Sequence, residues 1–364
     1  MGDIYMSSYL TLSATRSRSS SEGCFAGTPS AKLTGIDSHG QTYEVYARRL
    51  INHFRFLTAS KTDFLSYPLF ERSWCYQERL LSPRILHFGP QELFFECLED
   101  CKCECQWMQK IGSSFSSVPK RSHTNALLGR TVFDAQRRWY DIVSVYSALK
   151  LTRPSDRLPA LSGIAKQVQD CGMGQYYAGL WEVTVLEDLL WSVSPENAAD
   201  PRPLAWRAPS WSWASVDTAV GYGRRATVKE RYAHAIDIKT SPASVDPTGA
   251  VHAGHIILKG QVAPVIVFGP SQEEQMYALR PLHGSGYVML YPDSAKDIQN
   301  NQILYYMKIL TYAPDHMLLL IMVRSDPITQ TYTRVGISDA YLEDDQSWVE
   351  QVFCGSNERV VTIE

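Results

Sequence analysis

The chain has 364 residues, of which 45% are hydrophobic and 20% are charged. This length allows roughly two or three domains with buried cores, and the composition excludes a disordered or fibrous chain. The net charge of −3 gives no electrostatic reason to expect binding to nucleic acid or to an anionic membrane. No signal segment opens the chain, and the longest apolar stretch, HMLLLIMVRS, is too short to span a bilayer, so we expect a cytoplasmic protein.

The first 106 residues mix helical and strand patterns. Residues 1–15 start with a helical pattern and continue with alternating β-type residues, and residues 41–57 contain a second alternating run that predicts a strand. Residues 71–81 have the spacing of a short helix, which Pro83 should end. The segments RILHFG and ELFFEC then predict two strands that form a hairpin around a Gly-Pro turn.

The middle of the chain is predicted to be helical. Residues 107–131 are polar and irregular, which indicates a linker. Residues 132–195 should form three helices, of which the first, over 132–150, has the clearest helical spacing. Asp156 is placed to cap the second helix, and the third should cover the segment YYAGLWEVTVLEDLLWSV.

Residues 196–364 contain short β-type runs separated by Gly, Pro and Asp, which predicts an antiparallel β-rich C-terminal domain. The fold class expected for the whole chain is therefore α+β. Near the start of this region, RAPSWSWASVD predicts an extended strand with Trp211 and Trp213 on one face. Packing at a domain interface is favoured there over a platform for ligand stacking, because large aromatic side chains mostly serve packing.

Four of the eight cysteines, Cys97, Cys101, Cys103 and Cys105, lie within nine residues. We expect them to be thiols in a reducing compartment. The last three would share one face of an extended segment, which leaves a metal or redox role open. Structural zinc sites, however, usually combine two cysteine pairs across a long spacer, and no second half-site is evident. The spacing favours an acidic, cysteine-rich turn, so the sequence predicts no metal site and no cofactor.

The segment with the most varied chemistry is residues 68–97. A carboxylate such as Glu78, held beside the apolar wall of Trp74, would suit a general base or a ligand for a sugar hydroxyl. The structural alternative is that Trp74 belongs to the core and that Glu78 forms an ion pair with Arg84. The residues alone favour this structural alternative.

The same segment carries a resemblance. RSWCYQERLLSPRILHFG resembles the closing motif of the fungal heterokaryon incompatibility (HET) domain, R-x-W-x-x-Q-E-x-x-L-S-x-R-x-L-x-F. MGDIYMSSYLTLSAT is similar to an earlier stretch of that domain, and YSALKLTRPSDRLPALSGIA and RAPSWSWASVD are similar to the region that follows it. The resemblance touches most of residues 1–220. The motif positions that fit are Arg72, Trp74, Gln77, Glu78, Leu81, Ser82, Arg84, Leu86 and Phe88.

HET domains act in non-self recognition after hyphal fusion, where incompatibility triggers programmed cell death. The resemblance implies a protein of this allorecognition pathway that works through contacts with partner proteins. It also implies that residues 1–106 have a partial α/β fold like that of Toll/interleukin-receptor (TIR) domains. Some TIR relatives cleave NAD. If that activity extended to this chain, Glu78 would be the catalytic residue, Trp74 and Arg84 would bind the ligand, and NAD would be a substrate.

The chain departs from the HET pattern in one respect. The opening segment Y-x-x-x-S-Y-x-W-G and the later segment W-x-D-x-x-C-I-N-Q are absent. We therefore expect residues 1–106 to be the C-terminal part of a HET domain that is truncated at its N-terminus. Without the first strands of the domain an active site would be incomplete, which favours a protein without enzymatic activity. An inactive truncated paralogue is a third interpretation.

Overall fold

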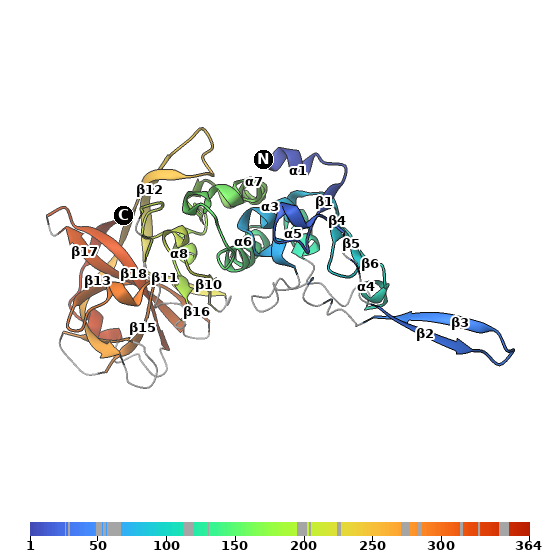
Figure 1. Cartoon of the computed structure of the whole chain (residues 1–364). Coiled ribbons are helices and arrows are strands. Elements are labelled where there is room, and N and C mark those ends of the chain that lie inside the picture. Colours follow the sequence, from blue (N-terminus) through green and yellow to red (C-terminus); the bar gives the residue numbers. More distant parts are fainter. Residues whose placement is uncertain are drawn as a thin grey trace. The chain divides into compact units, whose positions relative to one another are not determined.

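The computed structural model divides the chain into two compact units, Met1–Gly129 (unit 1) and Arg130–Glu364 (unit 2), drawn in Figure 1. Both units combine helices with mainly antiparallel strands, so the α+β class is confirmed. The structure describes residues 1–25, 27, 30–48, 53, 56, 67–111, 119–129, 131–194, 202–203, 205–223, 227–270, 277–282, 286–313, 316–326, 328–341 and 349–364.

Unit 1 is built on a small four-stranded sheet in the order β1-β4-β5-β6. Strand β1 is parallel to β4, and the other pairs are antiparallel. The elements are α1 (Gly2–Met6), β1 (Thr11–Ser13), β2 (Ala31–Ile36), β3 (Thr42–Ala47), α3 (Ser73–Leu81), β4 (Arg84–Phe88), β5 (Leu93–Cys97), β6 (Cys101–Cys103), α4 (Trp107–Ile111) and α5 (Pro119–Gly129), with short 3₁₀ helices at Ser20–Glu22 and Pro68–Glu71.

The short helix and the hairpin predicted for unit 1 are confirmed. Helix α3 ends at Leu81, and Ser82 adopts an extended conformation, as expected of a residue that precedes a proline. The predicted strand at 41–57 is confirmed over Thr42–Ala47, which pairs with β2 in an exposed hairpin. Of the rest of that segment, Gln41, Arg48, His53 and Phe56 are within the described residues.

The structure differs from the linker predicted at 107–131. The described part of this segment contains helices α4 and α5, and it belongs to unit 1 up to Gly129. Lys120 of α5 is fully buried and donates a hydrogen bond to the Ser82 carbonyl oxygen at 2.6 Å. The polar segment of α5 can therefore pack inside unit 1, because the buried Lys120 ammonium group has a hydrogen-bond acceptor there.

Unit 2 begins with the predicted helix, α6, which runs over Val132–Tyr146. The other helices are α7 (Ser162–Val168) and α8 (Val185–Asp188), with 3₁₀ turns at Pro154–Asp156, Pro159–Leu161, Trp213–Ser215 and Ala295–Asp297 and a π turn at Gln169–Met173. The strands are β7 (Tyr176–Tyr177), β8 (Leu180–Trp181), β9 (Trp191–Val193), β10 (Val220–Tyr222), β11 (Val228–Arg231), β12 (His234–Pro242), β13 (Val251–Pro270), β14 (Tyr277–Pro281), β15 (Val288–Pro292), β16 (Ile303–Tyr312), β17 (His316–Asp326), β18 (Thr331–Tyr341) and β19 (Glu358–Ile363).

A nine-stranded sheet closes on itself in unit 2. Strands β16, β17, β18, β15, β14 and β13 follow one another as antiparallel neighbours, and the pairing of β13 with β16 completes the circuit. Strand β13 is long enough to pair with β12 and β19 in its first half and with β14 and β16 in its second half. A cluster of buried apolar side chains, most of them from these strands, forms the core. The β-rich C-terminal region is thus confirmed as antiparallel.

Two predictions for the middle segment are wrong. The third helix predicted at 176–193 is replaced by three short strands and the four-residue helix α8, and Asp156 lies in a 3₁₀ turn, six residues before α7 begins at Ser162. Gly179, at φ +104°, interrupts any continuous helix. Its lack of a side chain is required, because a Cβ there would lie 2.4 Å from the Trp213 indole nitrogen. Helices α6 and α7 belong to the same compact unit as the β-rich region.

Within the described ranges, no helix is long and apolar enough to cross a membrane.

Candidate functional site

The HET-like motif forms a helix, a turn and a strand in unit 1. Arg72 is exposed at the N-terminus of α3, whereas Gln77, Leu81 and Ser82 are buried. The Ser82 hydroxyl donates to the Glu78 carbonyl oxygen at 2.7 Å and lies 2.9 Å from the Thr11 hydroxyl of β1. Ser82 therefore connects the helix to the first strand of the sheet.

Glu78 lies on α3 and lines a small cavity of about 100 Å³ together with Tyr5, Cys75 and Arg79. Burial raises the pKa of Tyr5 to about 12, and the negative charge of Glu78 and its hydrogen bond with the phenol add to this shift. Burial also raises the pKa of Cys75 to about 12, again with a contribution from Glu78. The Tyr5 phenol and the Cys75 thiol beside Glu78 are thus both neutral near pH 7.

The structure does not bring all three nominated residues into this cavity. Neither Trp74 nor Arg84 is among the residues that line it. Arg84 is exposed at the start of β4, where its guanidinium lies 5.2 Å from the ring centroid of Tyr9 and donates to the Tyr9 carbonyl oxygen. Trp74 is half-buried on α3.

A buried ion pair of unit 1 joins Arg79 and Glu96, neither of which the sequence singled out. Arg79 Nε lies 2.7 Å and Nη2 3.3 Å from the two carboxylate oxygens of Glu96. His87 Nε2 lies 3.1 Å from the same carboxylate, and its Nδ1 is 3.0 Å from the Thr15 hydroxyl. Both Glu96 and His87 are buried. The alternation of β4 and β5, which places His87 and Glu96 on their buried face, is the sequence signal that could have found them.

These contacts shift pKa values within the cluster. Burial opposes ionisation of Glu96, but the charges of Arg79 and Lys120 and the hydrogen bond with His87 outweigh it and hold its pKa well below the usual range. Burial lowers the pKa of His87 to about 4 and that of Lys120 to about 8. Glu96 is therefore ionised and His87 neutral near pH 7, which is the pattern of a structural charge cluster.

The tryptophan segment of unit 2 is also packed. The strand expected for residues 207–217 is wrong, because Trp213 starts a 3₁₀ turn. Trp211 and Trp213 are fully buried, and the indole nitrogens of Trp213 and Trp139 both donate to the Gly179 carbonyl oxygen, at 3.1 and 2.9 Å. These contacts fit the packing interpretation of the sequence.

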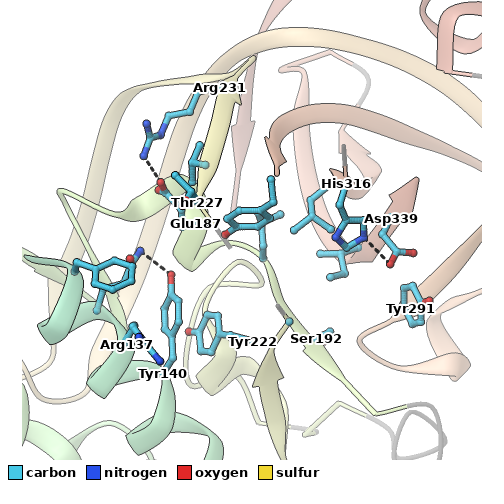
Figure 2. A pocket seen from close by; sticks show the side chains of 18 residues that line it. Arg137, Tyr140, Glu187, Ser192, Tyr222, Thr227, Arg231, Tyr291, His316 and Asp339 are labelled. Carbon is cyan, nitrogen blue, oxygen red and sulfur yellow. Dashed lines mark hydrogen bonds and ion pairs between the residues drawn. The ribbon is translucent and has the colours of Figure 1, made fainter. Parts of the chain in front are cut away.

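A pocket of unit 2 has a volume of about 520 Å³ (Figure 2). It is lined by side chains of α6, α8 and the strands β9 to β11 and β15 to β18. No residue nominated from the sequence lines this pocket. The residues that line it lie far apart in the sequence, so no local motif could predict the pocket. The apolar part of its wall includes Leu190, Leu318 and Ile337.

One side of the pocket is a pair of tyrosines. The rings of Tyr140 and Tyr222 are stacked, with centroids 3.7 Å apart and planes 10° apart. The Tyr140 hydroxyl donates to Asp188 at 2.8 Å and accepts from the Gln136 amide at 2.9 Å. Among the described residues, the Tyr222 hydroxyl is buried without a hydrogen-bond partner. A buried hydroxyl of this kind costs free energy until a ligand or water satisfies it.

Two polar pairs stand on other sides of the pocket, as Figure 2 shows. Glu187 of α8 forms an ion pair with Arg231 of β11. His316 Nε2 of β17 lies 3.0 Å from the Asp339 carboxylate of β18. Arg137 also lines the pocket, so its two arginines equal its two carboxylates in number. The pocket therefore offers donors and acceptors on separate walls with little net charge.

Asp188 does not line the pocket, but it holds the Tyr140 hydroxyl by a hydrogen bond. Its carboxylate accepts hydrogen bonds from the Trp181 amide at 2.8 Å and from the Thr184 hydroxyl at 3.0 Å, besides that of Tyr140. Burial raises the pKa of Asp188 to about 7, against the opposite effect of these donors. The carboxyl group thus changes its charge near neutral pH while it holds the Tyr140 hydroxyl in place.

Unit 1 contains a second group of functional interest, formed by His53, Glu92, Cys103 and Cys105. Their ligand-type atoms lie within 4.8 Å of one another. The sequence pointed to the two cysteines but not to the histidine or the glutamate. All eight cysteines are free thiols, as expected.

Comparisons of the chain with protein-family models, with curated proteins and with solved structures found no match.

Proposed function

We propose that this chain is a heterokaryon-incompatibility-type signalling protein whose unit 2 binds a small organic molecule. The pocket of about 520 Å³ carries the ligand-binding part of the proposal. Small-molecule sites typically measure about 300–1,000 Å³ and combine apolar walls with a few placed polar groups. The pocket of unit 2 has both properties.

The chemistry of the walls defines the class of ligand. The stacked rings of Tyr140 and Tyr222 offer an aromatic edge and face to a planar ring. The Glu187–Arg231 and His316–Asp339 pairs offer hydrogen bonds on other sides. Because two arginines and two carboxylates of the lining balance in charge, the ligand we propose is a planar aromatic molecule that is neutral or zwitterionic and has polar groups at opposite ends.

The signalling part of the proposal rests on the HET-like motif. Nine positions of varied chemistry fit this motif, and one of them, Ser82, links the end of α3 to the sheet of unit 1 through Thr11. In this proposal unit 1 is the TIR-like remnant of a HET domain and acts by contacts with partner proteins in the cytoplasm, in non-self recognition and cell-death signalling. Ligand binding by unit 2 would then supply a chemical signal to that pathway.

NAD cleavage by Glu78 is the alternative proposal. The cavity beside Glu78 measures about 100 Å³, which is below the usual size of a small-molecule site. A dinucleotide would need a larger cavity, and neither Trp74 nor Arg84 lines this one. The geometry therefore supports the ligand pocket of unit 2 better than an NAD site in unit 1.

Saturation-transfer difference NMR on the full chain tests the proposal, with a panel of phenols, indoles, purines and NAD as probes. We expect signals from planar aromatic probes, and we expect Leu318→Trp to abolish them because the indole fills the pocket. Ile328→Trp adds the same ring at a turn where the side chain is 90% exposed, and should leave the signals unchanged. No pocket-dependent signal from any probe would contradict the proposal, and release of nicotinamide from NAD would favour the alternative.

A further inference from the structure

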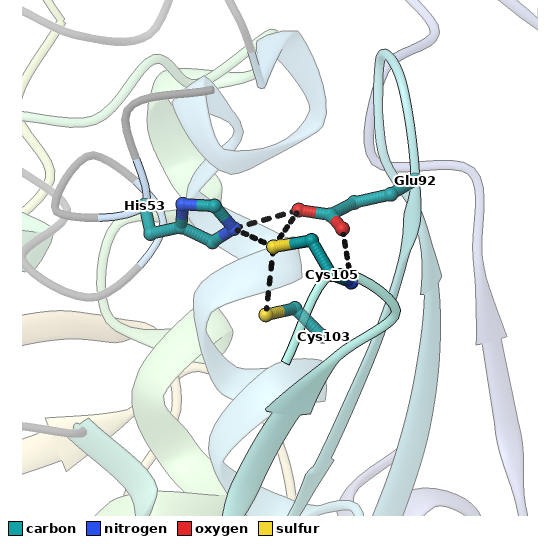
Figure 3. Close-up of side chains that lie close together, drawn as sticks. All are labelled: His53, Glu92, Cys103 and Cys105. Carbon is teal, nitrogen blue, oxygen red and sulfur yellow. Dashed lines mark hydrogen bonds and ion pairs between the residues drawn. The ribbon is translucent and has the colours of Figure 1, made fainter. Parts of the chain in front are cut away.

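We infer that His53, Glu92, Cys103 and Cys105 bind a zinc ion. Figure 3 shows the imidazole, the carboxylate and the two sulfur atoms facing a common point. These four side chains come from three separate stretches of the chain, so the fold supplies the half-site that the cysteine spacing lacks. The inference is independent of the pocket in unit 2.

The donor atoms already stand close to the distances of a tetrahedral site. Cys103 Sγ is 3.5 Å from Cys105 Sγ, and Cys105 Sγ is 3.2 Å from His53 Nε2 and 3.6 Å from Glu92 Oε1. Donors about 2.0–2.3 Å from a tetrahedral zinc stand roughly 3.2–3.8 Å from one another. The 2.7 Å between His53 Nε2 and Glu92 Oε1 must lengthen, because a metal ion replaces the hydrogen bond there. All four donor atoms lie within 4.8 Å of one another, so binding an ion requires only small shifts of these side chains.

The surroundings orient each donor. Glu92 Oε2 accepts from the Cys105 amide at 2.9 Å and lies 3.3 Å from Arg48 Nη2, which leaves Oε1 directed at the cluster. The sulfur of Cys103 accepts a hydrogen bond from the Met108 amide at 3.4 Å. Outer contacts of this kind fix metal ligands and tune their basicity.

Packing holds the histidine in place as well. The His53 ring stacks on Trp107, with centroids 4.8 Å apart, and meets the edge of Phe94. The side chains of His53 and Glu92 are 1% and 0% exposed. Cys105 is the exposed member of the group and gives an ion a path from solvent. Thiols are weak hydrogen-bond donors, so the hydrogen bonds of the two cysteines with the buried histidine and carboxylate stabilise the fold little. A bound metal ion would stabilise the same arrangement more strongly.

The donor set selects the metal. Two sulfur atoms with one nitrogen and one oxygen suit zinc, which prefers four tetrahedral ligands of this mixed kind. Zinc would bind the two cysteines as thiolates, and both thiol protons would pass to solvent. Because the protein supplies all four ligands, the site is a structural one that ties His53 to the β5–β6 hairpin and to the turn before α4.

Metal analysis of the full chain, purified under reducing conditions, tests this inference. We expect stoichiometric zinc in the native protein and loss of that zinc in the double variant Cys103→Ser, Cys105→Ser. His53→Gln should weaken zinc binding by more than about 100-fold, because losing a ligand costs more than losing an outer contact. Cys97→Ser changes a thiol of the same hairpin that is outside the group, and should keep the zinc.

Cobalt substitution of the native chain gives a readout that does not depend on any variant folding. We expect the visible absorption of tetrahedral cobalt together with a near-ultraviolet thiolate-to-cobalt band. A native chain that retains no zinc and shows neither band would overturn the inference. Equal zinc content in the native protein and in the double variant would do the same, because it would place the ion elsewhere.

Discussion

Units 1 and 2 both bury ion pairs against aromatic rings, but they distribute the charges differently. In unit 1 a single carboxylate, Glu96, serves Arg79 and His87, and the Arg79 guanidinium lies 4.8 and 4.4 Å from the ring centroids of Phe56 and Phe70. In unit 2 the carboxylate of Asp293 is shared by two arginines. The Arg79–Glu96 cluster of unit 1 therefore depends on one anion, whereas Asp293 of unit 2 keeps a second cation when the first is removed.

The arginines of unit 2 show this redundancy. Arg334 is fully buried, with its guanidinium 3.4 Å from the ring centroid of Trp191, and it lies 3.1 Å from Asp293 Oδ1. Arg202 lies 3.0 Å from the other oxygen of Asp293 and also pairs with Asp297 at 2.9 Å. Buried charges are costly unless they are paired, so the number of partners decides how much a substitution destabilises each unit.

The largest effect that we expect is for Glu96→Gln. The substitution removes the anion and leaves the buried charge of Arg79 unpaired, which should destabilise unit 1 by about 3–5 kcal/mol. Urea unfolding followed by hydrogen exchange of the β4–β5 peptides measures it. Glu99→Gln, at an exposed position just after β5, is the control and should change the free energy of unfolding little. A loss below about 1 kcal/mol would contradict the single-anion account of unit 1.

The next effect is an opposite pH dependence of the two units between about pH 4 and 6.5. In unit 1 the folded state lowers the pKa of His87 to about 4, so its stabilising contribution is present above the ordinary value of 6.5 and is lost as the pH falls through about 4. In unit 2 the folded state raises the pKa of Asp188 to about 7, so the stability of this unit depends on pH in the opposite direction. Its contribution is present below the ordinary value of 3.8 and is lost as the pH rises through about 7.

Each group can contribute about 1.4 kcal/mol per pH unit within its window, which amounts to roughly 3–4 kcal/mol in all. Melting of the native chain and of Asp188→Asn across this pH range measures the contribution of Asp188. We expect the variant to lose the stabilisation of unit 2 toward low pH, whatever its stability at neutral pH. Asp170→Asn, an exposed aspartate of the same unit, is the matched control. An unchanged slope in Asp188→Asn would show that the carboxyl group is not protonated in the folded protein.

The smallest effect that we expect is for Arg334→Met. Asp293 keeps its contact with Arg202, and Arg334 Nε and Nη1 are buried without hydrogen-bond partners among the described residues. The loss should be about 1–3 kcal/mol, less than for Glu96→Gln, because no charge is left unpaired. Chemical unfolding of unit 2 measures it. A loss equal to or greater than that of Glu96→Gln would remove the difference between the two units.

Local patterns in the sequence correctly predicted the elements that bury one continuous face. Helix α6 and the β4–β5 hairpin have clear spacing, since one face of each is buried along its whole length. The segment 176–193 misled this approach, because its apolar residues pack in several directions around Gly179 instead of along one helical face. A glycine that accepts two indole hydrogen bonds leaves no periodic signal in the sequence.

The sequence by itself determined the α+β class, the β-rich C-terminal region and the free thiols. Only the tertiary structure decided where the charges and donors meet. Glu96 lies on a strand whose partner supplies His87, the pocket of unit 2 takes its walls from distant helices and strands, and His53 reaches Cys105 across fifty-two positions. The physical reason is that spacing along a chain reports the neighbours of one helix or strand, whereas sites arise where separate elements pack together.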